Sequence, residues 1–246
     1  NRSTSRARGG VRSVLVVAQF SISAVLILMA ISVHQQTQFM NQQDLGYDPS
    51  LLVGIPVGRY SKSASLETLR HDLGDHPSIL SITASEPPLG TNQEGGRRSV
   101  VRPEGEEQGK WEMQVFDIDD GFLETFGIDI IAGRNLQVEG DGEAFLLNET
   151  AVRQLGWDRE GLGDAIGKRF EIDPRVGHVV GVVADFHSQS LHHPIGALVM
   201  QQRGDWVYAI TARMREDDVP GAFAHLEKVW VEHILDIPFE WWYVDD

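Results

Sequence analysis

The stretch VLVVAQFSISAVLILMAISV, residues 14–33, contains 20 consecutive positions without a charged side chain. Aliphatic residues fill most of it. A helix rises about 1.5 Å per residue, so this stretch spans about 30 Å, which is the thickness of the hydrocarbon core of a bilayer. The stretch therefore predicts one transmembrane helix, with a short flank before it and a long domain after it.

Charge is distributed unevenly on the two sides of this stretch. Residues 1–13 contain four arginines and no acid, whereas the residues after the stretch carry 36 acidic and 17 basic side chains, a net charge of −19. The positive-inside rule places the basic flank in the cytoplasm. The acidic part, from about residue 34 on, then lies on the opposite, periplasmic or extracellular side of the cell membrane. An acidic domain also argues against nucleic acid as a partner, because phosphate binding needs clustered lysine and arginine.

Two other interpretations of residues 14–33 compete with the membrane span. A signal peptide has a shorter apolar core and a small-x-small cleavage site, and SVHQQTQFMNQQ, which follows, shows no such site. A buried core helix of this length normally shows polar residues at helical spacing.

Helix formers in residues 34–45 predict a stalk that continues the span and ends near Gly46, before Pro49.

Residues 46–246 predict a domain of strands and helices outside the membrane, which makes the chain α+β in class. Segments rich in β-branched and aromatic residues predict strands at 51–57, 79–84, 99–102, 111–118, 144–147, 178–183, 198–201, 207–214 and 239–244. Helices are expected at 65–73, 121–126, 149–155 and 219–235. The last helix has the clearest apolar stripe, and Asp217 or Asp218 can cap its start with Pro220 in the first turn.

The first and the last of these helices each lie between two strands. They predict two β-α-β units at opposite ends of the domain, which together form one mixed α/β, porter-like part from residues 46–87 and 206–246. Residues 88–205 would then be an inserted, strand-rich part.

Two stretches of the sequence come close to a phosphate-binding loop and a calcium-binding loop, but neither motif is intact. GLGDAIGKR, residues 161–169, has one residue too many between its glycines for a phosphate loop, and an arginine in place of the hydroxyl. DIDDGFLETFGI, residues 117–128, lacks the glycine and the glutamate of a calcium EF-hand loop, so Asp119 or Asp120 is expected to cap the helix that follows. Asn148 likewise reads as the cap of helix 149–155. Without cysteine, neither a disulfide nor a zinc–cysteine site can form.

The stretch GVVADFHSQSLHHPIGALVM, residues 181–200, places one aspartate and three histidines within nine positions. A shared metal ion is one interpretation. However, the paired histidines precede a proline, which favours extended or turn backbone over a helix face. The alternative is scaffold, with Asp185 and His187 holding a turn by hydrogen bonds to backbone and with Phe186 and Leu191 buried.

Residues 14–57 and the blocks FDIDDGFLETFGIDIIAGRNL, FLLNETAVRQLGW, IGKRFEI and VVGVVADFHSQSLHHPIGALVM follow one another along nearly the whole chain. In this order they resemble the FtsX-like ABC transporter permeases and their MacB-like periplasmic core domain. The usual acidic-proline pair before the last apolar run is replaced by Gly196 and Ala197. The motif residues with an expected structural role are Gln19, Phe20, Gly46, Tyr47, Gly133, Arg134, Asn148, Glu149, Asp185, Phe186, His187, Ser190 and Leu191.

This resemblance implies a domain without catalytic residues, cofactor or metal of its own. It implies that a cytoplasmic ABC ATPase subunit hydrolyses ATP, and that the domain couples the resulting helix motion to export or extrusion of a substrate. A second permease copy or a periplasmic adaptor is a further expected partner. Two alternatives from other classes stay open: a membrane-anchored extracellular ligand-binding sensor, and a periplasmic metal-dependent hydrolase based on the histidine stretch.

Residues 46–246, produced without the apolar stretch, are expected to form a soluble acidic domain, because the membrane signal is confined to residues 14–33. Purification in detergent-free buffer followed by gel filtration measures this. Recovery of the fragment only in detergent would show that the boundary is misplaced.

Overall fold

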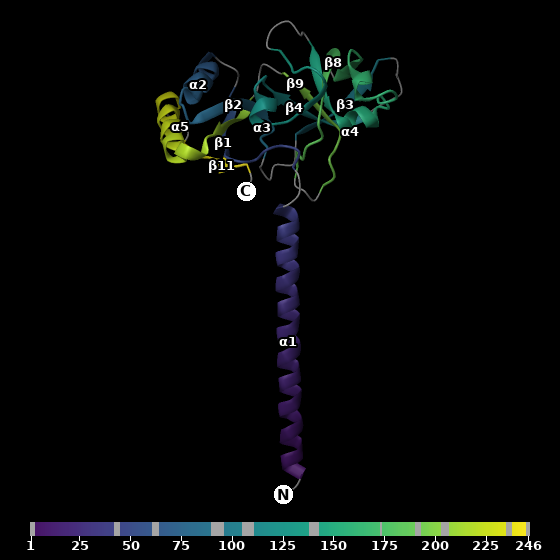
Figure 1. The fold of residues 1–246 in the computed structure, drawn as a ribbon, viewed down its shortest axis with the longest axis vertical. Helices are drawn as coiled ribbons and strands as arrows, with labels where there is room; N and C mark the ends of the chain where they lie inside the picture. Colours follow the sequence, from purple (N-terminus) through teal and green to yellow (C-terminus); the bar gives the residue numbers. More distant parts are fainter. Residues whose placement is uncertain are drawn as a thin grey trace. The chain divides into compact units, whose positions relative to one another are not determined.

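The computed structural model of the chain describes residues 3–41, 45–60, 64–89, 96–104, 111–137, 143–172, 174–189, 193–202, 207–234 and 238–244. The chain divides into two compact units, Asn1–Asp44 and Leu45–Asp246. Figure 1 shows a single helix in the first unit and a mixed α/β domain in the second.

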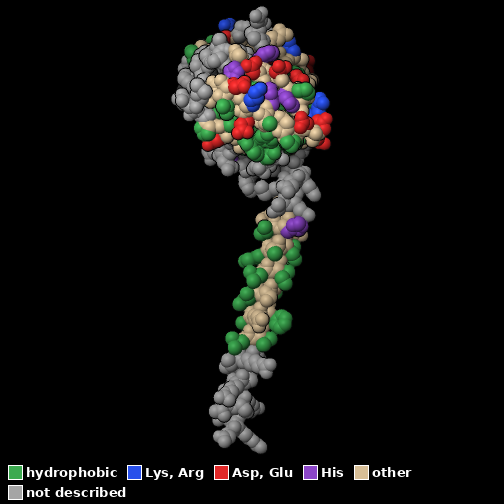
Figure 2. Space-filling view, turned by 90° about the vertical axis from the view of Figure 1, so that its left-hand side faces the viewer, with side chains coloured by type: hydrophobic (Ala, Val, Ile, Leu, Met, Phe, Trp, Pro, Cys, Tyr) green, Lys and Arg blue, Asp and Glu red, His purple; other side chains and the backbone are tan. Residues whose placement is uncertain are grey.

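The first unit contains one long helix, α1 (Ser3–Asn41). Its segment Leu15–Gln36 has a mean hydropathy of 2.3 and no buried residue, and it is the one helix of the described residues that is long and apolar enough to cross a membrane. Figure 2 shows hydrophobic side chains along this segment. A core helix would be mostly buried, so these features favour the membrane span. The helix is described as far as Asn41, and residues 42–44, over which the stalk was expected to continue toward Gly46, lie outside the described residues.

In the second unit, one sheet contains all the described strands. The strands are β1 (Leu52–Tyr60), β2 (Ile79–Glu86), β3 (Arg97–Pro103), β4 (Trp111–Ile118), β5 (Ile130–Gly133), β6 (Ala144–Asn148), β7 (Arg169–Ile172), β8 (Arg175–Val183), β9 (Leu198–Gln201), β10 (Val207–Met214) and β11 (Trp242–Tyr243). The helices are α2 (Ala64–Gly74), α3 (Phe122–Phe126), α4 (Glu149–Gln154) and α5 (Val219–His233), with short 3₁₀ helices η1 (Leu162–Ala165) and η2 (Glu216–Asp218).

The two predicted β-α-β units form one layer, as expected. The strand order is β11-β1-β10-β2 with antiparallel neighbours, so the two units interleave rather than lie side by side. Helices α2 and α5 pack together against this layer, on the left in Figure 1. Asp218 accepts a hydrogen bond from the Gly221 N–H at 3.1 Å and caps α5, with proline in the first turn, also as expected.

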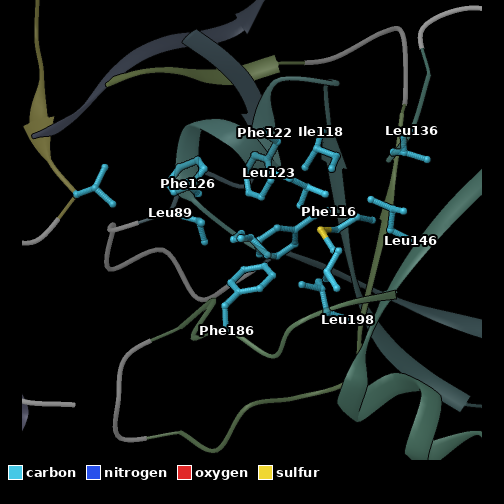
Figure 3. Close-up of a cluster of buried hydrophobic side chains, with 14 of the residues drawn as sticks. Leu89, Phe116, Ile118, Phe122, Leu123, Phe126, Leu136, Leu146, Phe186 and Leu198 are labelled. Atoms are coloured by element: carbon cyan, nitrogen blue, oxygen red, sulfur yellow. The ribbon is translucent and has the colours of Figure 1, made fainter. Parts of the chain in front are cut away.

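Six of the seven strands between β2 and β10 close into a ring, and β5 pairs with β8 outside it. β4, β3, β7, β8, β6 and β9 pair in that order, and β9 pairs again with β4. Each strand contributes a side chain to a common buried cluster, which we call the barrel core: Val115, Val101, Phe170, Val179, Phe145 and Val199. Alternate residues of β4, β6 and β9 point the other way, into a second cluster around α3, which we call the α3 core (Figure 3).

The four strands β11-β1-β10-β2 form what we call the porter-like layer. The sheet is narrow where this layer continues into the six-stranded ring. β2 and β4 pair at only two positions, Ser85 with Ile118 and Glu86 with Asp117. One sheet therefore runs through both parts, and the division at residues 87 and 206 stays a prediction. Two strands, β5 and β7, were not expected, since each is only four residues long.

Helix α5 offers a matched pair of substitutions. Val229 is buried in the core of the porter-like layer, with 5% of its surface exposed, whereas Val231 is 58% exposed. Val229→Ala is expected to lower the free energy of unfolding by about 2 kcal/mol through lost burial and a residual cavity. Val231→Ala is expected to change it by less than about 0.5 kcal/mol. Urea denaturation of both variants, followed by tryptophan fluorescence, measures the difference, and equal effects would contradict the packing of α5.

Candidate functional site

The first residues of the second unit, 45–50, which we call the junction segment, lie against the turn 185–187. The backbone N–H of His187 donates a hydrogen bond to the Leu45 carbonyl at 2.8 Å. Gly46 has a φ of +74°, and a Cβ placed on it would lie only 2.7 Å from the Phe186 Cα. Both the backbone conformation and the close approach therefore require glycine at this position.

Phe186 holds this turn in the domain interior. Its side chain is 1% exposed and belongs to the α3 core. Figure 3 shows it among side chains from β4, α3, β6 and β9, and its ring meets that of Phe116 edge-on at 6.4 Å between centroids. The motif phenylalanine thus fixes the backbone against which Gly46 lies.

The Asp185 carboxylate reaches the first turn of α4. One oxygen accepts the Thr150 N–H at 2.9 Å, and the other accepts the Thr150 hydroxyl at 2.7 Å, with Arg153 at 3.3 Å. Asn148 accepts the Ala151 N–H at 2.9 Å and is the N-cap of α4, as expected. Two side chains from different parts of the chain therefore satisfy backbone donors that α4 leaves unpaired at its start.

The expected hydrogen bonds of the 185–187 turn differ from those in the structure. Asp185 does accept a backbone N–H, but that of Thr150, 35 positions earlier, rather than one in its own turn. His187 contributes its backbone N–H. Ser190 and Leu191, and the first of the paired histidines, lie outside the described residues, and His193 is exposed. Within the part of the chain that the structure describes, no group of three or more histidines and acids could hold a metal ion.

The remaining motif residues occupy four places. Gly133, with a φ of +76°, and Arg134 lie against β8, where the Arg134 N–H donates to the Val180 carbonyl at 3.0 Å. Glu149 forms an ion pair with Arg153. The ring of Tyr47 meets that of Phe126 edge-on at 5.8 Å between centroids, and Gln19 and Phe20 are exposed on α1.

Arg213 in β10 is a site residue that sequence reasoning missed. Its guanidinium group donates to the Asp48 carboxylate at 2.9 Å and to the carbonyls of Asp48, Ser50 and Thr125 at 2.7, 3.0 and 2.9 Å. Burial would raise the pKa of Asp48, but hydrogen bonds from Ser50 and the charge of Arg213 outweigh it, so the pKa is lowered. Asp48 therefore stays ionised and paired. No local pattern signals this pair, because its members are 165 positions apart.

The expectation that Asp119 or Asp120 is the N-cap of α3 is wrong, although the Asp119 carboxylate does accept the Gly121 N–H at 3.1 Å. The N-cap of α3 is Gly121, without a side-chain cap bond. Asp119 is 2% exposed; it forms an ion pair with Arg70 of α2 at 2.9 Å and accepts the Ala84 N–H of β2 at 2.7 Å. Burial raises the pKa of this carboxyl, and the Arg70 charge, the Thr83 hydroxyl and the Ala84 N–H oppose that rise. Asp119 therefore connects α2 to β2 beside the place where β2 pairs with β4.

With this geometry described, the chain can be compared with known proteins. It matches the MacB-like periplasmic core domain over residues 15–228. The chain belongs to this family. No curated protein matches it. The α+β fold with an N-terminal apolar helix agrees with that of the family, so the resemblance stated from the sequence is confirmed. MacB-like periplasmic core domains are generally non-catalytic parts of ABC transporter permeases, and the apolar helix suits a membrane anchor.

Two solved structures show the same fold. The periplasmic region of MacB from Actinobacillus actinomycetemcomitans is 17% identical, with a TM-score of 0.58 over 81% of this chain and 91% of that one. The extracellular domain of the noncanonic ABC-type transporter YknZ from Gram-positive bacteria is 10% identical, with a TM-score of 0.50 over 74% of this chain and 94% of that one.

Asp185→Ala is expected to lower the free energy of unfolding by about 1–2 kcal/mol, the range for a lost helix cap or buried hydrogen bond. Asp158→Ala, which removes an exposed carboxylate near α4, is the control and is expected to change it by less than about 0.5 kcal/mol. Urea denaturation compares the two. An Asp185→Ala variant as stable as the control would show that the Thr150 contacts contribute nothing.

Proposed function

We propose that this chain is the extracytoplasmic part of an ABC transporter permease, and that it couples ATP-driven motion of transmembrane helices to export or extrusion of a substrate. In this proposal ATP is hydrolysed by a cytoplasmic ABC ATPase subunit at a bacterial inner membrane. A second permease copy or a periplasmic adaptor would complete the assembly. Family membership supports the permease assignment, and the junction segment supports the coupling.

The backbone contact between Leu45 and His187 is the observation that carries the coupling. Leu45 follows the apolar helix closely in the sequence, and its carbonyl is bonded directly to the turn 185–187. Because Gly46 has no side chain, backbone lies against backbone at this point, without a flexible side chain between them. A displacement of the junction segment would therefore reach the turn, and through Asp185 the start of α4.

The two ends of the second unit also lie side by side. The Val244 N–H donates to the Leu52 carbonyl at 3.1 Å, and β11 pairs with the start of β1. The start of β1 and the last described residues of the second unit therefore lie together. This arrangement suits a domain carried between two membrane segments, as in the permease proposal.

A membrane-anchored sensor is the alternative function. An open hollow of about 420 Å³ between α2 and β2, lined by residues that include Arg70, His71 and Ser81, is the feature that a small ligand could use. Ligand pockets normally enclose 70–90% of a drug-sized ligand. An open hollow fits that requirement poorly, so the permease proposal is preferred.

The test uses the whole permease with its ATPase in lipid nanodiscs and measures amide hydrogen exchange with and without ATP. Coupling predicts that ATP changes the exchange of residues 45–50 and 185–187 on the far side of the membrane. In Gly46→Ala the response of 185–187 is expected to fall at least fivefold, the lower end of usual coupling strengths. ATP hydrolysis is expected to stay within about twofold of the unaltered protein.

Gly156→Ala is the matched control for this test. Gly156 has a similar φ of +64°, but a Cβ placed on it would meet nothing within 4 Å. It therefore introduces the same backbone strain without the clash, and the ATP response of 185–187 should persist. If ATP does not change amide hydrogen exchange anywhere in the second unit, the proposed coupling is contradicted and the sensor is favoured.

A further inference from the structure

Arg213 lies where β10 meets the beginning of β1. It is directly opposite Leu52 in the antiparallel register of the two strands. Its side chain is only 15% exposed, whereas that of Asp48, its ionic partner, is 55% exposed. The guanidinium group therefore reaches outward from the sheet to the junction segment.

The four hydrogen bonds of Arg213 join two segments that are distant in sequence. Three go to the junction segment, at the Asp48 carboxylate and the carbonyls of Asp48 and Ser50, and the fourth goes to the Thr125 carbonyl in α3. A guanidinium group offers five N–H donors in a fixed plane, whereas a lysine ammonium offers three on a flexible stem. Arginine is thus matched to this set of acceptors.

Backbone hydrogen bonds also hold Asp48 of the junction segment and Leu51, which directly follows the segment. The Asp48 N–H donates to the Phe126 carbonyl at 2.9 Å, and the Met214 N–H donates to the Leu51 carbonyl at 2.9 Å. Leu51 has a φ of +53°, a strained conformation that persists only where its surroundings impose it. The first half of the segment, in contrast, is bonded to His187.

We infer that Arg213 is a positioning residue that ties the junction segment to the porter-like layer, so that this layer moves with the segment and with the turn 185–187. The inference rests on the proposed coupling function and adds a second route to it. The first route runs through Leu45 and Gly46 to the turn 185–187. The second runs through Asp48 and Arg213 to β10 and α3.

Exchange in the same nanodisc complex, with ATP as the probe, separates the two routes. In Arg213→Gln, the ATP-dependent change of amide exchange in β10 and α3 is expected to fall at least fivefold. The response of 185–187 is expected to persist within about twofold, because the Leu45 and Gly46 contacts are intact. A residue that merely stabilised the fold would not remove one response and leave the other.

Arg215→Gln is the matched control. Arg215 carries the same charge two positions further on, but it is about half exposed and pairs with Asp217 at 3.8 Å. Both ATP responses should therefore persist in this variant. Arg213→Lys covers the case in which Arg213→Gln does not fold: it keeps the charge and loses the planar set of donors, so it should weaken the β10 and α3 response as well.

Each outcome bears on one claim. A full β10 and α3 response in Arg213→Gln or, where that variant does not fold, in Arg213→Lys overturns the role of Arg213, and so does an equal loss at 185–187 in the folded variant. If Gly46→Ala removes the response of 185–187 while Arg213 variants change nothing, only this inference fails. If the unaltered complex shows no response to ATP, the proposed function itself fails.

Discussion

The direct contact of backbone with backbone at Gly46 constrains this structure more than any other single feature. A glycine with positive φ lets the Leu45 carbonyl meet the His187 N–H, and any larger residue would overlap Phe186. The turn that receives this contact is held in the α3 core by Phe186, and its aspartate binds the first turn of α4. The position of the junction segment is therefore linked to both the interior of the domain and a helix on the six-stranded ring.

The apolar side chains of the domain are divided between separate buried clusters. Neighbouring residues of β4, β6 and β9 enter the barrel core and the α3 core alternately, so each strand stabilises both. The porter-like layer has its own core; its strands continue into the ring through two residue pairs of β2 and β4, and Leu52 and Val244 join the α3 core. The short pairing of β2 with β4 needs further stabilisation, and the buried ion pair of Asp119 with Arg70 provides it on one side. Arg213 provides it on the other, through the junction segment.

Several features of the site could be predicted from local sequence. Asn148 lies directly before a helical pattern, and an asparagine in that position caps the helix whatever the rest of the fold does. Phe186 follows a strand of apolar residues, so its burial was also expected. The partner of Asp185 was not, because a carboxylate in a turn can accept any nearby N–H and only the folded chain decides which one is near. The same limit applies to Asp119, which was assigned to its own helix but mainly bridges α2 and β2.

The sequence by itself determined the apolar helix, the α+β class and the two β-α-β units, but not the way in which their strands interleave. Each of these follows from a periodicity or a length that the chain carries locally, such as the uncharged stretch 14–33 or the apolar stripe of α5. Only the tertiary structure decided the closure of six strands into a ring, because β4 pairs in parallel with β9, some eighty positions away. It alone decided that Arg213 would reach Asp48. Pairing of this kind depends on which segments are brought together when the apolar faces are buried, and neither residue carries a local signal for a partner 165 positions distant.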